Sequence, residues 1–190
     1  MIRIAITPPE ILTDEAGMIT AILNEGWDYV HLRHPGADVV AIEEILKQIP
    51  ELFHDRIRIY DHFGLFDRYN LGGIHLNSKA SAELRCPHSR SCHSIEDVLA
   101  ADGCDYVTLS PIFDSISKTG YRASQFDFKR LETLPHPKVI ALGGVTAERL
   151  ANFDCYNFDG FATIGAVFSD MPADWVPAIC QRLHAFDIID

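Results

Sequence analysis

Residues 91–121 read SCHSIEDVLAADGCDYVTLSPIFDSISKTGY, and this stretch contains the end of one predicted strand, a helical pattern and a second strand. A short segment ends at His93, and Ser94 followed by two acidic residues is a typical helix start. Gly103 is a typical helix stop, and the apolar run that follows, Tyr106 to Ser110, is typical of a strand covered on both faces. The stretch therefore predicts two parallel strands joined by a right-handed helical crossover.

The same alternation continues along the rest of the chain. Short β-type runs occur at Ile2–Thr7, Tyr29–Arg33, Ile57–Asp61, Gly73–Leu76, His88–Cys92, Tyr106–Ser110, Val139–Leu142 and Gly160–Ile164. Helical patterns, some of them weak, lie at residues 13–26, 39–49, 65–71, 78–84, 94–103, 146–150 and 173–186. We therefore predict an α/β fold, a compact (β/α)8 TIM barrel with shortened helices, in a single domain spanning residues 1–190. A doubly wound open sheet is the alternative.

The composition limits the classes of partner. The chain has 190 residues, 47% of them hydrophobic, and a net charge of −11, which disfavours nucleic acids and anionic membrane surfaces. A small anionic ligand remains compatible with this charge, because it responds to local groups. No run approaches the roughly 20 apolar residues of a membrane span, and the first residues lack a signal-peptide pattern. Five cysteines without CxxC spacing are typical of a reduced protein, so we expect a cytoplasmic location.

Glycines and cations follow several of the predicted strands. In a barrel, the residues after the carboxyl ends of the strands form the active-site face. Gly143 and Gly144 follow the seventh run and Gly165 the eighth, which predicts a phosphate site, with ordinary turn geometry as the alternative. Arg33 and Lys118 are candidates to bind a second anionic group, unless they are solvated surface cations.

Two further residues are candidates for chemistry. Asp61, after the third run, is a candidate Mg²⁺ ligand or base, with a helix N-cap as the alternative. His93 is a candidate general acid/base, because histidine side chains titrate near neutral pH; a residue outside the Ser94 cap without chemistry is the alternative. The spacing around Cys86 and Cys92 matches no standard zinc site, and the spacing of His31, His34, His62 and His75 does not enforce a metal site.

Several segments, taken in order, resemble the thiamine phosphate synthase/TenI superfamily. They are His31-Leu32-Arg33, Arg58 to Asp61, Gly73 to Leu76, Ser91 to Ser94, Asp105 to Phe113 with Ser117-Lys118, and Ile140 to Val145. The resemblance extends over roughly Ile4 to Val167 and also implies a (β/α)8 barrel. It implies catalytic roles for His93, Lys118 and Arg33, and Mg²⁺ binding by Asp61 only in a synthase. It implies substrate or phosphate binding by Gly143, Gly144, Gly165, Ser91, His31, Ser110 and Ser117.

The resemblance implies two possible activities. A synthase joins a pyrimidine diphosphate to a thiazole phosphate with Mg²⁺, whereas a TenI-type enzyme moves a proton within carboxythiazole phosphate without a metal. This sequence departs from the synthase pattern Gln-x-Arg-x-Lys at His31 and Pro35, and it has Tyr60 where the family has asparagine. It also has no acid in Asn77-Ser78-Lys79, where a second metal ligand is expected.

We therefore predict a TenI-type thiazole tautomerase that uses His93 as its acid/base group and no cofactor. Thiamine phosphate synthase with Mg²⁺ is the first alternative, and a non-catalytic thiazole-phosphate-binding or regulatory protein is the second. The expected ligands are a phosphorylated thiazole and, for a synthase, a pyrimidine diphosphate. A homodimer is common for such barrels and is left open by the sequence.

Overall fold

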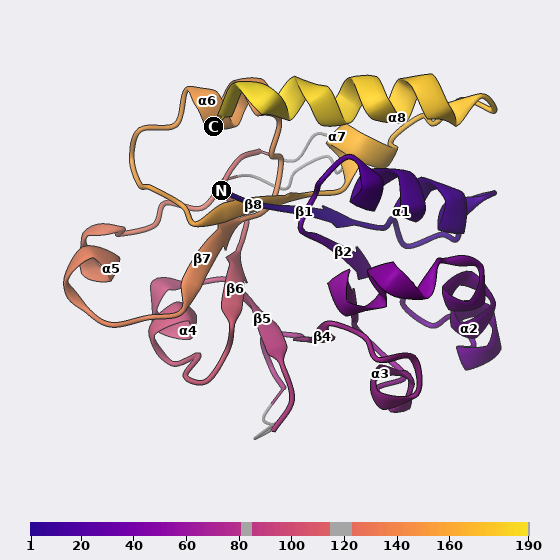
Figure 1. The fold of residues 1–190 in the computed structure, drawn as a ribbon. Helices are drawn as coiled ribbons and strands as arrows, with labels where there is room; N and C mark the ends of the chain where they lie inside the picture. Colours follow the sequence, from indigo (N-terminus) through magenta and orange to yellow (C-terminus); the bar gives the residue numbers. More distant parts are fainter. Residues whose placement is uncertain (81–84, 115–122, 190) are drawn as a thin grey trace.

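The computed structural model describes residues 1–80, 85–114 and 123–189, and its strands form one closed barrel (Figure 1). Neighbouring strands are parallel and follow the order of the sequence, and β8 pairs back with β1. The strands are β1 (Ile2–Ile6), β2 (Tyr29–Leu32), β3 (Ile57–Ile59), β4 (Gly73–Leu76), β5 (His88–Cys92), β6 (Tyr106–Leu109), β7 (Lys138–Ala141) and β8 (Gly160–Thr163). The predicted barrel is confirmed, and the open-sheet alternative is wrong.

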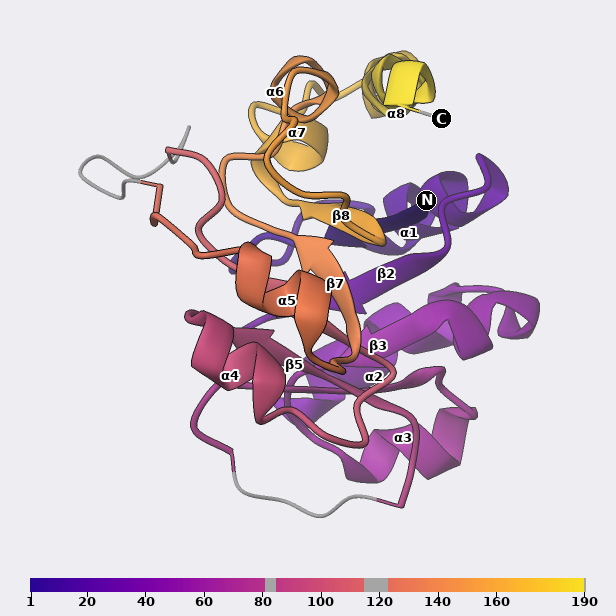
Figure 2. The ribbon, with the colours of Figure 1, turned by 90° about the vertical axis from the view of Figure 1, so that its left-hand side faces the viewer.

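Helices surround the barrel, with α6, α7 and α8 grouped on one side and α2 and α3 on the opposite side (Figures 1 and 2). Their short lengths agree with the prediction, since α4, α5 and α6 have five residues each. The helices are α1 (Glu15–Asn24), α2 (Val39–Gln48), α3 (Gly64–Tyr69), α4 (Ile95–Leu99), α5 (Lys129–Thr133), α6 (Ala147–Ala151), α7 (Gly165–Phe168) and α8 (Trp175–His184), with 3-10 helices η1 (Glu51–Arg56) and η2 (Ala185–Ile189).

Capping side chains explain where three of these helices begin. Asp38 accepts a hydrogen bond from Val40 N at 2.8 Å, and Ser94 accepts one from Asp97 N at 3.0 Å. Thr146 does the same for Arg149 N at 3.2 Å. Each bond satisfies a backbone N–H that has no acceptor within the helix. These starts agree with the helical patterns expected at residues 39–49, 94–103 and 146–150.

The short elements η1, α5 and α7 are absent from the prediction. Each has six residues or fewer, which is too short for a hydrophobic period to be visible in the sequence. The weak helix expected at residues 78–84 falls partly outside the described residues, and within the described part Ser78 and Lys79 form a turn.

The barrel interior has an apolar part and a polar part. Because side chains alternate along a strand, every second residue points inward. Strands β1, β6, β7 and β8 contribute a small cluster inside the barrel, made of Ile4, Ile6, Tyr106, Ile140 and Ala162. Strands β2 to β5 contribute the fully or almost fully buried polar residues His31, Arg58, His75 and Ser89. The larger hydrophobic cluster lies on the outer faces of the strands, beneath the helices.

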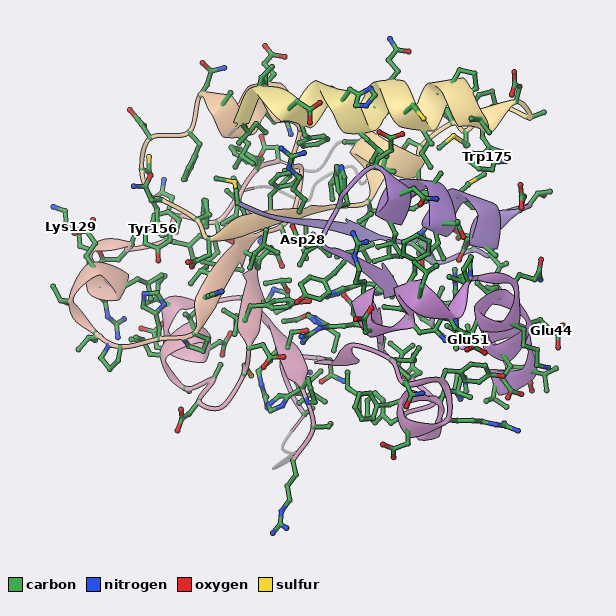
Figure 3. All side chains as sticks on the ribbon, in the orientation of Figure 1. Asp28, Glu44, Glu51, Lys129, Tyr156 and Trp175 are labelled. Carbon is green, nitrogen blue, oxygen red and sulfur yellow. The ribbon has the colours of Figure 1, made fainter. Side chains whose placement is uncertain are left out.

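Charged side chains such as Glu44, Glu51 and Lys129 are exposed at the edges of the molecule (Figure 3). In the described part of the chain, no helix has the length and apolar character required to cross a membrane.

Candidate active site

A cavity of about 310 Å³ opens at the carboxyl ends of the strands, next to β1 to β3 and β5 to β8. Its lining combines apolar side chains with a few polar ones and with glycine backbone, which is the usual character of a small-molecule site. The described lining residues are Ile6, Arg33, Tyr60, Ser91, His93, Ser110, Pro111, Phe113, Leu142, Gly143, Gly144, Val145, Ala162, Thr163, Ile164, Gly165 and Ala166.

The two glycines after β7 adopt conformations that other residues avoid. Gly143 has φ 94° and Gly144 has φ 63°, both in the left-handed region. A Cβ on Gly143 would lie 2.8 Å from Pro111 Cα, and one on Gly144 would lie 2.2 Å from the Asp114 carbonyl oxygen. Residues 143 and 144 must therefore be glycine for the chain after β7 to pack this closely against the loop after β6. Without side chains, their backbone lines the cavity.

Gly165 supplies the second stretch of glycine backbone in the cavity wall. It is the first residue of α7, and the first N–H groups of a helix have no intrahelical acceptor. The structure thus brings Gly143, Gly144 and Gly165, which are predicted to bind phosphate, to one side of one cavity.

The position of His93 in the cavity wall is set by hydrogen bonds at the ends of β5 and β6. Its ring Nδ1 lies 3.1 Å from the Ser110 carbonyl oxygen and 3.3 Å from Ser110 Oγ, while its backbone N–H donates to Asp97. A carbonyl oxygen can only accept, so this contact places the hydrogen on Nδ1. The other ring nitrogen, Nε2, then carries the lone pair and can take up a proton.

Buried polar residues support the cavity from inside the barrel. Ser91 Oγ lies 2.9 Å from His75 Nε2, and His75 Nδ1 lies 2.8 Å from Ser89 Oγ. His31, which is fully buried, contacts the Tyr60 hydroxyl through Nδ1 at 3.3 Å and the Tyr106 hydroxyl through Nε2 at 2.6 Å. His31 therefore lies below the cavity wall, behind Tyr60.

Burial determines the charge of these interior groups. It lowers the pKa of His75 to about 3, and the nearby Arg58 guanidinium lowers it in the same direction. Burial likewise places the pKa of His31 well below its ordinary value, and it raises the pKa of Tyr60 and Tyr106. All four side chains are consequently neutral at neutral pH.

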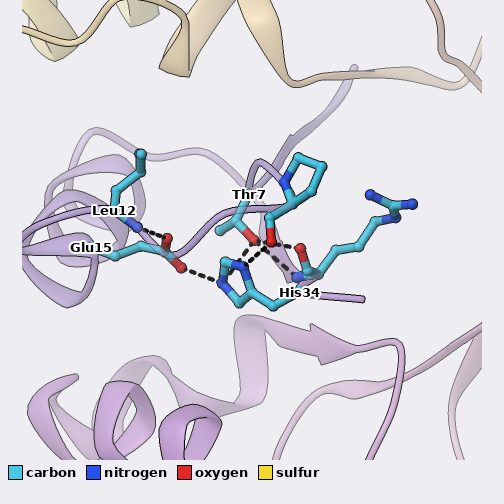
Figure 4. A network of polar contacts seen from close by, with 6 residues as sticks. Thr7, Leu12, Glu15 and His34 are labelled. Atoms are coloured by element: carbon cyan, nitrogen blue, oxygen red, sulfur yellow. Dashed lines mark hydrogen bonds and ion pairs between the residues drawn. The ribbon is translucent and has the colours of Figure 1, made fainter. Parts of the chain in front are cut away.

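Arg33 lines the cavity, and a buried network holds its backbone (Figure 4). The Arg33 N–H donates to Thr7 Oγ1 at 2.9 Å, and the same oxygen lies 3.4 Å from His34 Nε2. His34 Nε2 lies 2.6 Å from Glu15 Oε1, with both side chains only 1% exposed, and His34 Nδ1 faces the Pro9 carbonyl oxygen. Because a carboxylate accepts, we interpret the short contact as a hydrogen bond that His34 Nε2 donates to Glu15.

Other predicted site residues are placed elsewhere. Asp61 is exposed and does not line the cavity, and the residue that precedes α3 is Phe63, so Asp61 is not the N-cap of that helix either. Lys118 and Ser117 lie outside the described residues. Among the residues that the structure does describe, no group of three or more His, Cys, Asp or Glu side chains could hold a metal ion.

The cavity also contains residues that the sequence reasoning did not assign to it. Tyr60, Phe113 and Thr163 belong to its wall, and the Arg33 guanidinium carbon lies 5.8 Å from the centre of the Tyr60 ring. Tyr60 directly follows β3, Thr163 ends β8 and Phe113 lies in the loop after β6, and these positions at strand ends are the signal that would have found them.

Comparisons with known proteins agree with this geometry. The model of the family described as thiamine monophosphate synthase matches residues 4–167. Thiamine-phosphate synthase of Methanoculleus marisnigri is 31% identical to this chain, and the match covers 76% of each of the two chains. The thiamine-phosphate synthase of Pediococcus pentosaceus is 27% identical, and the match covers 88% of this chain and 85% of the relative. A crystal structure of thiamine phosphate pyrophosphorylase from Bacteroides thetaiotaomicron has a TM-score of 0.77 and 28% identity, covering 100% of this chain and 99% of that one. The chain belongs to the thiamine monophosphate synthase family, in the thiamine phosphate synthase/TenI superfamily.

Proposed function

We propose that this family member is a thiazole tautomerase that moves a proton within carboxythiazole phosphate. The observation that carries the proposal is the hydrogen bond between His93 Nδ1 and the Ser110 carbonyl oxygen, which leaves the lone pair of this cavity-lining histidine on Nε2. In the proposed reaction, Nε2 removes a proton from one atom of the substrate and returns it to another, so that charge and atoms balance.

The remaining cavity residues bind and orient the substrate in this proposal. The glycine backbone at Gly143, Gly144 and Gly165 receives the phosphate, because backbone N–H groups can approach it without a side chain between them. Arg33 provides a positive charge for a second anionic group, the ring carboxylate. A cavity of about 310 Å³ lies at the lower end of the range for small-molecule sites, which suits one phosphorylated ring.

The second candidate is thiamine phosphate synthase, and the names of the curated relatives favour it. This reaction would use a pyrimidine diphosphate and Mg²⁺, for which carboxylates are the usual protein ligands. The described cavity wall contains no carboxylate, and Asp61 lies outside it. The described residues therefore do not fit the metal, and we derive no step through it.

One experiment separates the candidates. In the first reaction, carboxythiazole phosphate is incubated with the protein in D₂O without metal, and NMR follows proton exchange and the isomer ratio. A parallel reaction also contains the pyrimidine diphosphate and Mg²⁺ and is assayed for thiamine phosphate. We expect isomerisation in the first reaction, and a fall of about 10²- to 10⁴-fold in His93→Gln. His184→Gln, at an exposed histidine paired with Glu25, is the matched control.

The outcomes are distinct. Full isomerisation by His93→Gln would refute the proposed role of His93. Thiamine phosphate formed only with Mg²⁺, and no metal-free isomerisation, would establish the synthase instead. Tight binding of carboxythiazole phosphate without turnover in either reaction would indicate the non-catalytic alternative.

A further inference from the structure

A continuous chain of hydrogen-bonding side chains crosses the polar part of the barrel interior. We call it the interior chain, and its members in order are Ser91, His75, Ser89, Tyr106, His31 and Tyr60. The two end residues, Ser91 and Tyr60, line the cavity. The four residues between them are buried, with at most 2% of their surface exposed, and none of them lines the cavity.

Three of the contacts along the interior chain are shorter than 3.0 Å. Tyr106 occupies the middle, with its hydroxyl 2.6 Å from His31 Nε2. On its other side lies Ser89, the residue with which Tyr106 is paired across β5 and β6, and the Ser89 hydroxyl acts to lower the pKa of Tyr106 against the larger effect of burial. Ser89 and Ser91 then contact the two nitrogens of one ring, that of His75, at 2.8 and 2.9 Å. Each member thus reaches the next through a group that can both donate and accept.

The hydrogen-bond directions along the interior chain depend on one another because its histidines and tyrosines are neutral. The histidines and tyrosines in it are neutral, and a neutral imidazole has one N–H donor and one lone pair. A ring that donates to one neighbour must therefore accept from the other. If the bonds run from Ser91 toward Tyr60, Ser91 presents lone pairs to the cavity; if they run the other way, it presents its hydrogen.

We propose that Tyr106 and His75 are positioning residues that hold the Ser91 hydroxyl in one hydrogen-bonding orientation toward the bound thiazole phosphate. The inference rests on the proposed function in taking Ser91 as a ligand contact. It gives a functional reason for polar groups in the interior of a barrel, where aliphatic side chains are usual.

The surroundings of Tyr106 keep its ring fixed, so that its hydroxyl can act on its neighbours. The Arg58 guanidinium carbon lies 4.5 Å from the centre of the Tyr106 ring, and Arg58 is held by an ion pair with Asp105 at 2.6 Å. The Tyr29 ring lies against Tyr106 at 5.8 Å between centroids. Removal of the Tyr106 hydroxyl alone should therefore break the chain in its middle while these ring contacts stay in place.

A purely structural role for the chain is the competing explanation, and a double-mutant cycle separates the two. The variants are Ser91→Ala, Tyr106→Phe and the double variant, with Tyr29→Phe as a control that removes a neighbouring hydroxyl outside the chain. The dissociation constant for carboxythiazole phosphate is measured by calorimetry, kcat and KM are measured in the isomerisation assay, and urea unfolding reports stability separately.

We expect Tyr106→Phe and Ser91→Ala each to weaken binding by about two- to tenfold, which corresponds to one ordinary hydrogen bond. The double variant should bind no more weakly than Ser91→Ala, because Tyr106 acts through Ser91. Tyr29→Phe should bind as the wild type does. Multiplicative losses in the double variant would overturn the inference, as would wild-type binding by a folded Tyr106→Phe.

The double-mutant cycle uses dissociation constants, which are measured without turnover. Its result therefore does not depend on whether the protein catalyses the proposed reaction. If His93→Gln isomerises at full rate, the proposed function fails while a non-additive cycle still supports the positioning role. If His93→Gln is inactive and the cycle is multiplicative, the proposed function stands and the positioning role fails.

Discussion

Acidification should destabilise this protein through His75. The folded chain holds His75 neutral inside the barrel, where burial and the neighbouring Arg58, Arg33 and Arg90 lower its pKa to about 3. The unfolded chain exposes the same imidazole to water, where its pKa is 6.5. Below pH 6.5 the unfolded state therefore binds a proton that the folded state does not, and protonation favours unfolding.

The magnitude follows from these two values. The contribution of His75 to stability is fully present above pH 6.5 and is lost as the pH falls toward 3. At pH 5 the unfolded chain is stabilised by RT ln(1 + 10^1.5), or about 2 kcal/mol, relative to pH 8. His31, whose pKa is lowered by the same burial and by the adjacent His75, adds to the loss in the same direction.

The assay is urea unfolding of the wild type and His75→Gln at pH 8 and at pH 5. The variant has no group at this position that titrates, so its loss of stability between the two pH values should be smaller by about 2 kcal/mol, whatever its stability at pH 8. Equal losses in the two proteins would show that the folded state accommodates a charged His75 and would refute the reasoning.

The remaining predictions concern the Arg33 network and the glycine wall. Glu15→Gln should lower the free energy of unfolding by about 1–3 kcal/mol, because the Gln amide has one acceptor oxygen where the carboxylate serves both Leu12 N–H and His34 Nε2, and the Glu15→Gln/His34→Gln double variant should regain part of that loss. Glu44→Gln, in an exposed ion pair, should cost clearly less stability in the same urea unfolding measurement, and an equal cost at the two positions would contradict the prediction. Gly143→Ala should weaken carboxythiazole phosphate binding at least about tenfold in calorimetry, since its Cβ would meet Pro111 and shift the wall. Gly26 has a similar φ of 85°, but a Cβ there would meet no atom within 4 Å, so Gly26→Ala should lower the stability and leave the affinity unchanged. Equal losses of affinity in Gly26→Ala and Gly143→Ala would refute the explanation that the clash with Pro111 shifts the cavity wall.

Local signals were sufficient for most of the barrel. Gly73–Leu76 and His88–Cys92 are strands with the predicted bounds, and the caps at Asp38, Ser94 and Thr146 start helices as expected. These features are encoded within a few residues of one another: the apolar run, the capping oxygen and the stop signal. Helices as short as α5 and α7 lack such a period, and contacts with the barrel stabilise them instead.

The candidate site was predictable where a residue follows its strand directly. Rules for strand ends led to Arg33, His93 and the glycines, and all of them line one cavity. The same rules could not separate Tyr60, which belongs to the wall, from Asp61, its exposed neighbour, since two consecutive residues at a strand end face different surroundings. His31 was predicted to bind the substrate, but it is fully buried below the cavity wall. Its strand position alone could not show this depth.

By itself, the sequence determined the alternation of strands and helices, the family and the residues at the strand ends, because these depend on local patterns and motif order. Only the tertiary structure decided which side chains meet. His75 and Ser91 are 16 residues apart, and His31 and Tyr106 are 75 apart, yet each pair is in hydrogen-bond contact. Closure of the barrel brings β2, β4, β5 and β6 around one interior. Burial there sets the charges of the histidines and tyrosines, and no local pattern in the chain encodes that environment.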